Sequence, residues 1–330
     1  MSRLLACLVL VSFSAVAAER PPVPRRPVHT YSIVARDPVT GDLGVAVQSH
    51  WFSVGTSVPW AEAGVGAVAT QSFVDPTYGR LGLDFMRAGR SAPETLKGLL
   101  AADGASDVRQ VGMVDAQGRV AAHTGKNNIA AAGHLMGEGF TVQANMMEKD
   151  TVWPAMAKAF RESKGDLAER MLVALEAAEA QGGDIRGKQS AAIIVVSGKA
   201  TGRPWVDRRF DLRVEDHPEP VKELRRLITL QRAYNAMNEG DLALERKDTD
   251  GALAAYSTAA KLAPGNAEML FWHAISLVSL GRVDEAMPLL NRAYAADPRW
   301  KELVTRLPAA GLLPNDPKLL GRLTGAKATR

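Results

Sequence analysis

The chain contains a single cysteine, Cys7, among its 330 residues. Cys7 lies in an N-terminal segment that we expect to be removed, so the mature chain would lack disulfides, a thiol nucleophile and a thiolate metal site. Beyond that segment, no stretch approaches the ~18 unbroken apolar residues of a membrane-spanning helix. We therefore expect no membrane association after the segment has been removed.

The common motifs of metal, nucleotide and serine-hydrolase sites are also missing. The six histidines form neither an HExxH nor an HxH pattern. There is no Walker loop, no GxGxxG after a predicted strand and no GxSxG elbow. These absences argue against a conventional zinc site, and we expect no metal and no cofactor.

The chain has no strongly basic body, although its formal net charge is +4. Residues 1–29 carry a charge of +3 and residues 315–330 carry a further +3, so the remainder carries −2. A body of this charge offers no basic face that could follow a phosphate backbone. We therefore expect no nucleic-acid partner.

Residues 1–18 have the pattern of a secretory signal peptide. Arg3 precedes an apolar stretch over 4–13, and small residues suited to cleavage follow at 15–18. Residues 19–29 hold four prolines and form a predicted pro-segment or linker. These features predict a periplasmic or secreted protein.

Residues 30–213 predict an α+β domain. The predicted strands form two hairpins and three single strands, and the helices occur in separate blocks. Such a pattern fits two antiparallel sheets that face each other with helices outside. The predicted strands cover 31–36, 43–48, 64–71, 109–115, 119–124, 140–146 and 191–196, and the predicted helices cover 91–102 and the segments capped by Thr151 and Asp166.

The chain becomes helical after a predicted linker at 214–220. Residues 221–313 repeat with an offset of 34, which pairs Ala252 with Ala286, Ala260 with Tyr294 and Pro264 with Pro298. This period is typical of tetratricopeptide repeats. Two units are few for an independent solenoid, so we expect them to pack on residues 221–238 and on the C-terminal helix. Residues 314–330 are predicted to form a basic tail.

Thr30 opens the first predicted strand directly after the pro-segment. A threonine with a free α-amine carries its own base, because that amine can accept the proton of the hydroxyl group. The simpler interpretation is a β-branched residue at the start of a strand. Both interpretations stay open from the residues alone.

Polar residues interrupt the apolar strands near their ends. Each could bond neighbouring strands, or the group could bind a substrate amide and an oxyanion beside Thr30. Lys188 could lower the pKa of the Thr30 amine or lie solvated on the surface. Asp184 and Arg186 could pair within a glycine-rich loop over 182–187. The strand-end candidates are Gln48, Ser49, Thr70, Gln71, Asn145, Lys188, Gln189 and Ser190.

Five segments together resemble a bacterial family of unknown function, DUF1028. They are residues 30–38, 41–49, 64–71, 165–170 and 182–191. The resemblance runs from about Thr30 to about Asp211. It implies an N-terminal-nucleophile hydrolase fold, an αββα sandwich in which Thr30 matches the family's threonine. The family's substrate is not established.

The chain departs from this family at both ends of the resemblance. Some members carry a peptidoglycan-binding module at the C-terminus, where this chain carries helical repeats. Signal cleavage near residue 18 would also leave Thr30 with an amide nitrogen, so a second cut at His29–Thr30 is required.

Three functional hypotheses follow. The first is an exported amidohydrolase or peptidase that uses Thr30. The second is a non-catalytic binding or scaffold protein whose repeats bind a peptide, a protein or a cell-wall enzyme. The third is that the repeats only cap the first domain or form a homo-oligomer.

Overall fold

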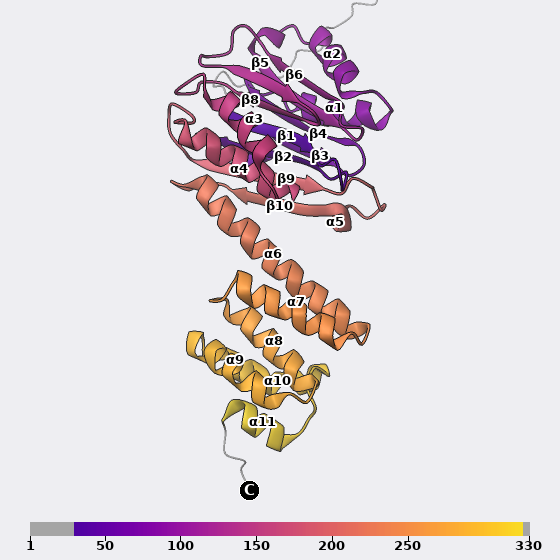
Figure 1. The fold of residues 1–330 in the computed structure, drawn as a ribbon, viewed down its shortest axis with the longest axis vertical. Coiled ribbons are helices and arrows are strands. Elements are labelled where there is room, and N and C mark those ends of the chain that lie inside the picture. Colours follow the sequence, from indigo (N-terminus) through magenta and orange to yellow (C-terminus); the bar gives the residue numbers. More distant parts are fainter. Residues whose placement is uncertain (1–29, 326–330) are drawn as a thin grey trace, which may run out of the picture.

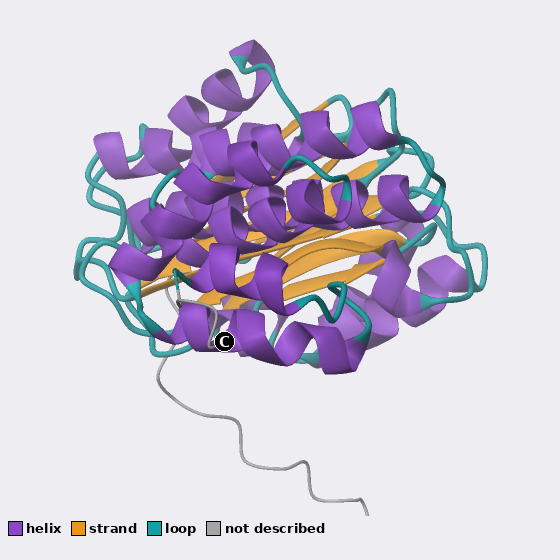
Figure 2. Cartoon of the chain, turned by 90° about the horizontal axis from the view of Figure 1, so that it is seen from below, coloured by secondary structure: helices purple, strands orange, loops and turns teal. Residues whose placement is uncertain are grey.

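The computed structural model describes residues 30–325 (Figure 1). The predicted signal peptide, the proline-rich segment and the last five residues of the predicted basic tail lie outside these residues. Strands and helices α1–α5 form one end of the molecule, and helices α7–α11 form the other. Seen from the helical end, the strands lie behind these helices (Figure 2). No helix within residues 30–325 is long and apolar enough to cross a membrane.

Within residues 30–325, ten strands form two antiparallel sheets. The six-stranded sheet has the order β10-β9-β2-β1-β8-β7, and the four-stranded sheet has the order β3-β4-β5-β6. The strands of the first sheet are β1 (Thr30–Arg36), β2 (Leu43–Ser49), β7 (Gly133–Gly137), β8 (Phe140–Ala144), β9 (Ser190–Val196) and β10 (Arg208–Val214). Those of the second are β3 (Pro59–Glu62), β4 (Gly66–Ser72), β5 (Arg109–Asp115) and β6 (Val120–Thr124).

The helices fall into two groups. Those of the N-terminal region are α1 (Thr77–Arg87), α2 (Ala92–Ala102), α3 (Val152–Glu162), α4 (Leu167–Ala180) and the short α5 (Pro204–Asp207). Those of the C-terminal region are α6 (Pro220–Glu245), α7 (Thr249–Leu262), α8 (Ala267–Ser279), α9 (Val283–Ala296), α10 (Arg299–Arg306) and α11 (Pro317–Thr324).

The layers of the N-terminal region pack against one another through three apolar cores. Side chains alternate along β1, so Ile33 packs with α3 and α4 while Val34 packs against the other sheet. On the far face of the four-stranded sheet, Val68 and Met113 pack with α1 and α2. The two sheets therefore face each other with helices on both outer faces.

The capping signals in the sequence correctly placed two helices. Ser91 and Glu94 form a reciprocal capping box at the start of α2. The Asp166 side chain accepts a hydrogen bond from the Glu169 main chain at the start of α4. Thr151 precedes α3 as predicted, but its hydroxyl donates to Gln181 instead of capping the helix.

Five α-helices and strands within residues 30–325 were not predicted, namely α1, α5, β3, β7 and β10. The Asp75-Pro76 pair is also typical of a turn, but Pro76 directly precedes the first residue of α1, where its missing N–H costs nothing. Strand β7 begins and ends with glycine, which weakens its sequence signal. Strand β10 occupies the segment at which the composition becomes polar, and it lies at the edge of its sheet.

Helix α6 belongs to two cores. Val221, Leu224 and Ile228 are buried in the core between the six-stranded sheet and α4. Further along the same helix, Ala233 and Met237 are buried against α7 and α8. The sheet region and the helical region therefore share one continuous helix.

The helical repeats pack as the 34-residue offset predicts. Ala252 in α7 and Ala286 in α9 are both fully buried at equivalent positions. An added Cβ at Gly240 of α6 would lie 2.5 Å from the Tyr256 ring, so this glycine permits the close crossing of α6 and α7. Helix α11 forms within the predicted basic tail, and its Leu323 is buried in the core of α8–α10.

Candidate functional site

Thr30 is the first residue of β1 and is buried. Strand β1 lies between β2 and β8, and Thr30 is opposite Ser49 of β2. Because side chains alternate along a strand, Thr30 lies on the same face as Ser32 and Val34, which contact the four-stranded sheet. The Thr30 side chain is therefore directed between the two sheets.

The main-chain carbonyl of Thr30 is held by Gln71 of β4 and by Asn145, the residue that follows β8. Gln71 Nε2 of β4 donates to this oxygen at 3.1 Å. The Asn145 main-chain N–H donates to it at 3.1 Å, and Asn145 Nδ2 donates at 3.5 Å. These bonds join both sheets to the first residue of β1 and fix its main chain.

The same amides continue into a buried network. Gln71 Oε1 accepts a hydrogen bond from the Ser32 hydroxyl at 2.6 Å, and Gln143 Nε2 donates to Ser32 Oγ at 2.6 Å. Gln110 Oε1 accepts from Gln71 Nε2 at 2.7 Å and from Asn145 Nδ2 at 2.8 Å. All five side chains are fully buried, so we call Ser32, Gln71, Gln110, Gln143 and Asn145 the inter-sheet network.

Sequence reasoning named Gln71 and Asn145 but missed Ser32 and Gln110. Both missed residues are polar at inward positions of otherwise apolar strands, and this signal could have identified them. A further signal is Gly112 of β5, where an added Cβ would lie 2.3 Å from Gln143 Oε1. The glycine therefore leaves room for the network between the sheets.

The network ends at His134 of β7. Gln110 Nε2 donates to Thr124 Oγ1 at 2.9 Å, and this hydroxyl lies 2.8 Å from His134 Nδ1. Burial, together with nearby His123, holds the pKa of His134 below its usual value.

Gln48 lies on the opposite face of its sheet from the Thr30 side chain. It is directly opposite Tyr31 and is fully buried. Neither its Nε2 nor its Oε1 has a hydrogen-bond partner among residues 30–325. Burial and the hydrogen-bonded Glu179 raise the pKa of the neighbouring Tyr31 phenol well above its usual value. Ser49, by contrast, lies on the Thr30 side.

The remaining strand-end candidates serve other contacts. Lys188 Nζ binds Glu179 Oε2 at 2.7 Å and Glu219 Oε2 at 3.1 Å, and the bond to Glu179 raises the pKa of Lys188. The other contacts are Gln189 Nε2 to Asp216 at 3.1 Å, Ser190 Oγ to the Trp51 carbonyl, and Thr70 Oγ1 to the Asp75 carbonyl at 3.1 Å.

Hydrogen bonds and an ion pair hold the loop over 182–187 next to the inter-sheet network. The buried Asp184 carboxylate accepts from Arg186 Nη2 at 2.7 Å and from the His50 main chain at 3.2 Å. The Ile185 N–H donates to the Met146 carbonyl at 3.2 Å, one residue beyond Asn145. The predicted pair of Asp184 and Arg186 thus forms and holds this loop against the ends of β2 and β8.

Across residues 30–325, no cluster of three or more His, Cys, Asp or Glu side chains is arranged to hold a metal ion.

Comparison with known proteins divides the chain into two parts. Residues 30–224 match the model of a family of unknown function, DUF1028, and residues 237–299 match a tetratricopeptide repeat. The crystal structure of protein SPO2555 from Silicibacter pomeroyi, described as a DUF1028 family-model protein, has a TM-score of 0.54 and 29% identity. That similarity covers 61% of this chain and 88% of the other. No curated protein matches the chain. The chain therefore belongs to the DUF1028 family, and a tetratricopeptide repeat region follows its family domain.

Proposed function

We propose that this protein is an exported amide hydrolase of the N-terminal-nucleophile type, with Thr30 as the nucleophile. The observation that carries the proposal is the position of Thr30 at the start of a central strand, with its carbonyl held from both sheets. The layering of two facing sheets between helices supports an αββα sandwich of this hydrolase type.

Chemistry at Thr30 needs a free α-amine. That amine accepts the proton as the Thr30 hydroxyl oxygen attacks the carbonyl carbon of an amide. The tetrahedral intermediate then releases the amine product, which takes up the proton, and an ester to Thr30 remains. Water attacks this ester with the same amine as base, which releases the acid and restores the hydroxyl group.

The inter-sheet network has a positioning role in this proposal. Gln71 Nε2 already donates to the Thr30 carbonyl, to Gln110 and to the Gln143 carbonyl. The hydrogens of the Gln71 amide are therefore already used in these hydrogen bonds, one of which holds Thr30. Gln71 and Asn145 therefore orient Thr30, and a positioned nucleophile lowers the entropic part of the barrier.

The decisive experiment compares two chains that differ by one residue, one beginning at Thr30 and one beginning at His29. The first has a free Thr30 amine and the second does not. We expect a β-lactone probe to acylate the chain that begins at Thr30, with the adduct located by mass spectrometry. Thr30→Ser should retain the adduct because it keeps a hydroxyl group.

Two results would contradict the hydrolase proposal. One is an adduct that persists in Thr30→Ala, and the other is equal labelling of the chain that begins at His29. Mass spectrometry of the exported protein should also find Thr30 as the first residue. This measurement tests both the export and the second cut.

A scaffold role is the second candidate. The tetratricopeptide repeats suggest protein–protein interaction, and a cleft of about 460 Å³ lies among α6 and α8. Met237, Met269 and Trp272 line it together with Asp241 and Glu268, which suits a peptide with apolar and basic side chains. A mature N-terminus upstream of Thr30 would favour this role over catalysis.

A further inference from the structure

A second cleft, of about 800 Å³, lies where the sheet region meets α6. One wall is α5 with the start of β10, and the other is α6 beyond Ile228. In Figure 1, α6 turns back from the end of β10 and runs below the sheet. Clefts of this size between domains are common ligand sites, and this one shares no residue with the inter-sheet network.

The first wall presents an exposed tryptophan on the short helix α5. Trp205 is 75% exposed, which is unusual for so large an apolar side chain. The nearby Asp207 is buried, and its two carboxylate oxygens share the Thr201 main-chain N–H at 3.0 and 3.1 Å. The Asp207 carbonyl also accepts from Ser197. The end of α5 is therefore held in place, and Trp205 of this helix lines the cleft.

A β-bulge adds a cation to the same wall. Arg208 pairs with Val196 and Phe210 pairs with Val195, so Arg209 is the extra residue of the bulge. Bulges at sheet edges redirect side chains. Arg208 binds Asp211 at 2.7 Å, whereas Arg209 makes no ion pair with any residue that the structure describes. Arg209 thus faces the cleft with its guanidinium donors available.

The second wall is a stripe of amide side chains on α6. Gln231, Asn235 and Asn238 follow one another at helical spacing and all line the cleft. Gln231 Nε2 donates to Asn235 Oδ1 at 2.9 Å, which leaves the Gln231 oxygen and the Asn235 NH₂ group for other partners. With Glu239 and Asp211 set against Arg208 and Arg209, the lining has no net charge.

We propose that this cleft binds a neutral oligosaccharide. A sugar hydroxyl both donates and accepts hydrogen bonds, as amide side chains do. The flat, apolar C–H face of a pyranose ring would stack on the Trp205 indole. The balanced charge of the lining favours a neutral ligand over an anionic or cationic one. This proposal does not depend on Thr30.

The test is calorimetric titration of the mature exported chain with three probes: the trisaccharides of β-1,4-linked N-acetylglucosamine, β-1,4-linked glucose and α-1,4-linked glucose. We expect at least one to bind and Trp205→Ala to weaken it by about tenfold or more. Trp205→Phe keeps an aromatic face and should lose about threefold or less. Phe52→Ala, which removes another exposed aromatic ring, should bind as the parent does.

Three outcomes would overturn the proposal. They are no binding of any of the three trisaccharides, equal binding by Trp205→Ala and the parent, and Trp205-dependent binding of unstructured peptides but not of sugars. Circular dichroism of Trp205→Ala should match that of the parent, because the side chain is exposed. Labelling of Thr30 by the lactone probe should be unchanged in this variant, which separates this site from the proposed hydrolase site.

Discussion

Two buried glutamines show that hydrogen-bond partners determine whether a buried glutamine stabilises the fold. Gln48 and Gln71 are both fully buried, Gln48 on the helix-covered face of the six-stranded sheet and Gln71 between the two sheets. Gln71 makes hydrogen bonds with Ser32, Gln110 and the Thr30 carbonyl. Both polar atoms of Gln48 lack a partner among residues 30–325. A buried amide without partners costs free energy, whereas a bonded one supports its neighbours.

Replacing each glutamine by leucine should therefore have opposite effects. Gln71→Leu leaves the Thr30 carbonyl and the Ser32 hydroxyl with fewer partners, so we expect the free energy of unfolding to fall by about 2–4 kcal/mol. Gln48→Leu removes an unpaired amide and should raise it by about 1 kcal/mol. Urea denaturation of the two variants measures both values, and an equal loss in both would contradict this account.

The sequence allowed the strand-end polar residues to be predicted as a group, but not their separation into two faces. Whether Gln48 or Ser49 lies beside Thr30 depends on the register of β1 and β2, which local patterns leave open. Ser32 and Gln110 were missed because a single polar residue in an apolar strand has many possible partners. The partners that reach them across the two sheets, Gln71 for Ser32 and Asn145 for Gln110, are distant in the sequence.

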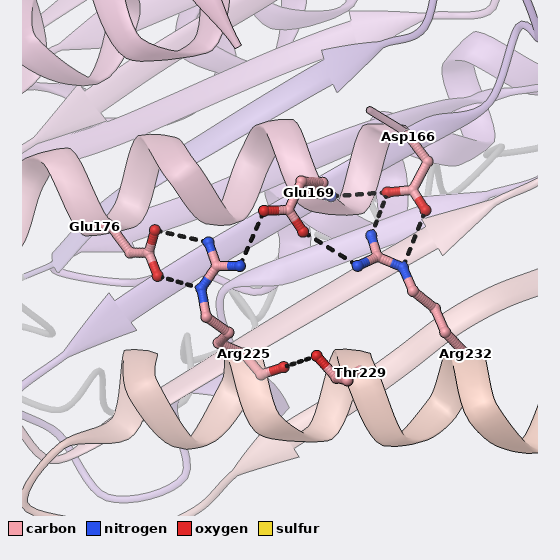
Figure 3. A network of polar contacts seen from close by, with 6 residues as sticks. All are labelled: Asp166, Glu169, Glu176, Arg225, Thr229 and Arg232. Carbon is pink, nitrogen blue, oxygen red and sulfur yellow. Dashed lines mark hydrogen bonds and ion pairs between the residues drawn. The ribbon is translucent and has the colours of Figure 1, made fainter. Parts of the chain in front are cut away.

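Helices α4 and α6 are joined by a row of ion pairs (Figure 3). Arg225 binds Glu169 at 2.9 Å and Glu176 at 2.5 Å, and Arg232 binds Asp166 at 2.7 Å and Glu169 at 3.1 Å. Burial alone would raise the pKa of Glu169, but the hydrogen bonds from both arginines lower it below its usual value of 4.5. Glu169 is therefore the shared acceptor between the two arginines.

The contribution of this row should depend on pH. Because the pKa of Glu169 is lower in the folded state, its stabilising effect is present above pH 4.5 and is lost as the pH falls through the folded value. Arg225→Met should lower the free energy of unfolding by about 1–2 kcal/mol at pH 7. The difference from the parent should shrink at pH 3 in thermal unfolding.

Arg226→Met is the matched control for Arg225→Met. Among the residues that the structure describes, Arg226 forms an ion pair only with Glu223 of its own helix, and it is mostly exposed. Its removal should change the free energy of unfolding by less than about 0.5 kcal/mol at either pH. A pH-independent effect of Arg225→Met would contradict a role for Glu169.

Element prediction succeeded where a local chemical signal marks an end. Ser91 with Glu94, and Asp166 with Glu169, correctly set the starts of α2 and α4. It failed for α1, because Pro76 is equally compatible with a turn and with the start of a helix. The edge strands β3, β7 and β10 were missed because they are only partly buried and therefore lack a clear apolar pattern. What burial they have comes from tertiary packing.

At the scale of the whole molecule, α6 determines where the chain can be divided. The 34-residue period identified the repeats, but α6 also completes the core of the sheet region with Val221, Leu224 and Ile228. No periodic signal distinguishes the half of α6 that packs on the sheet from the half that packs on α7. The two-core character of this helix emerged only from the structure.

Truncation should reveal this dependence. A chain that ends at Asp216 loses three buried apolar side chains worth about 4–8 kcal/mol together. This loss is comparable to the total stability of a typical domain, so we expect the shortened chain to unfold or aggregate. A chain that ends at Arg232 keeps these side chains and should fold, as measured by urea denaturation.

The two truncated chains also test the third hypothesis about the repeats. If the repeats form a homo-oligomer, light scattering should find the full chain associated and the chain that ends at Arg232 monomeric. If the chains ending at Asp216 and Arg232 unfold at the same urea concentration, α6 contributes nothing to the sheet region.

The length of α6 has a mechanical consequence. Its 26 residues span about 39 Å, and its first half is embedded in the sheet region. The free half is about 20 Å long, so a tilt of about 5° where the helix leaves the sheet region would move its far end by about 2 Å. The helix would thus act as a lever, and a partner bound to the repeats would move relative to the sheet region.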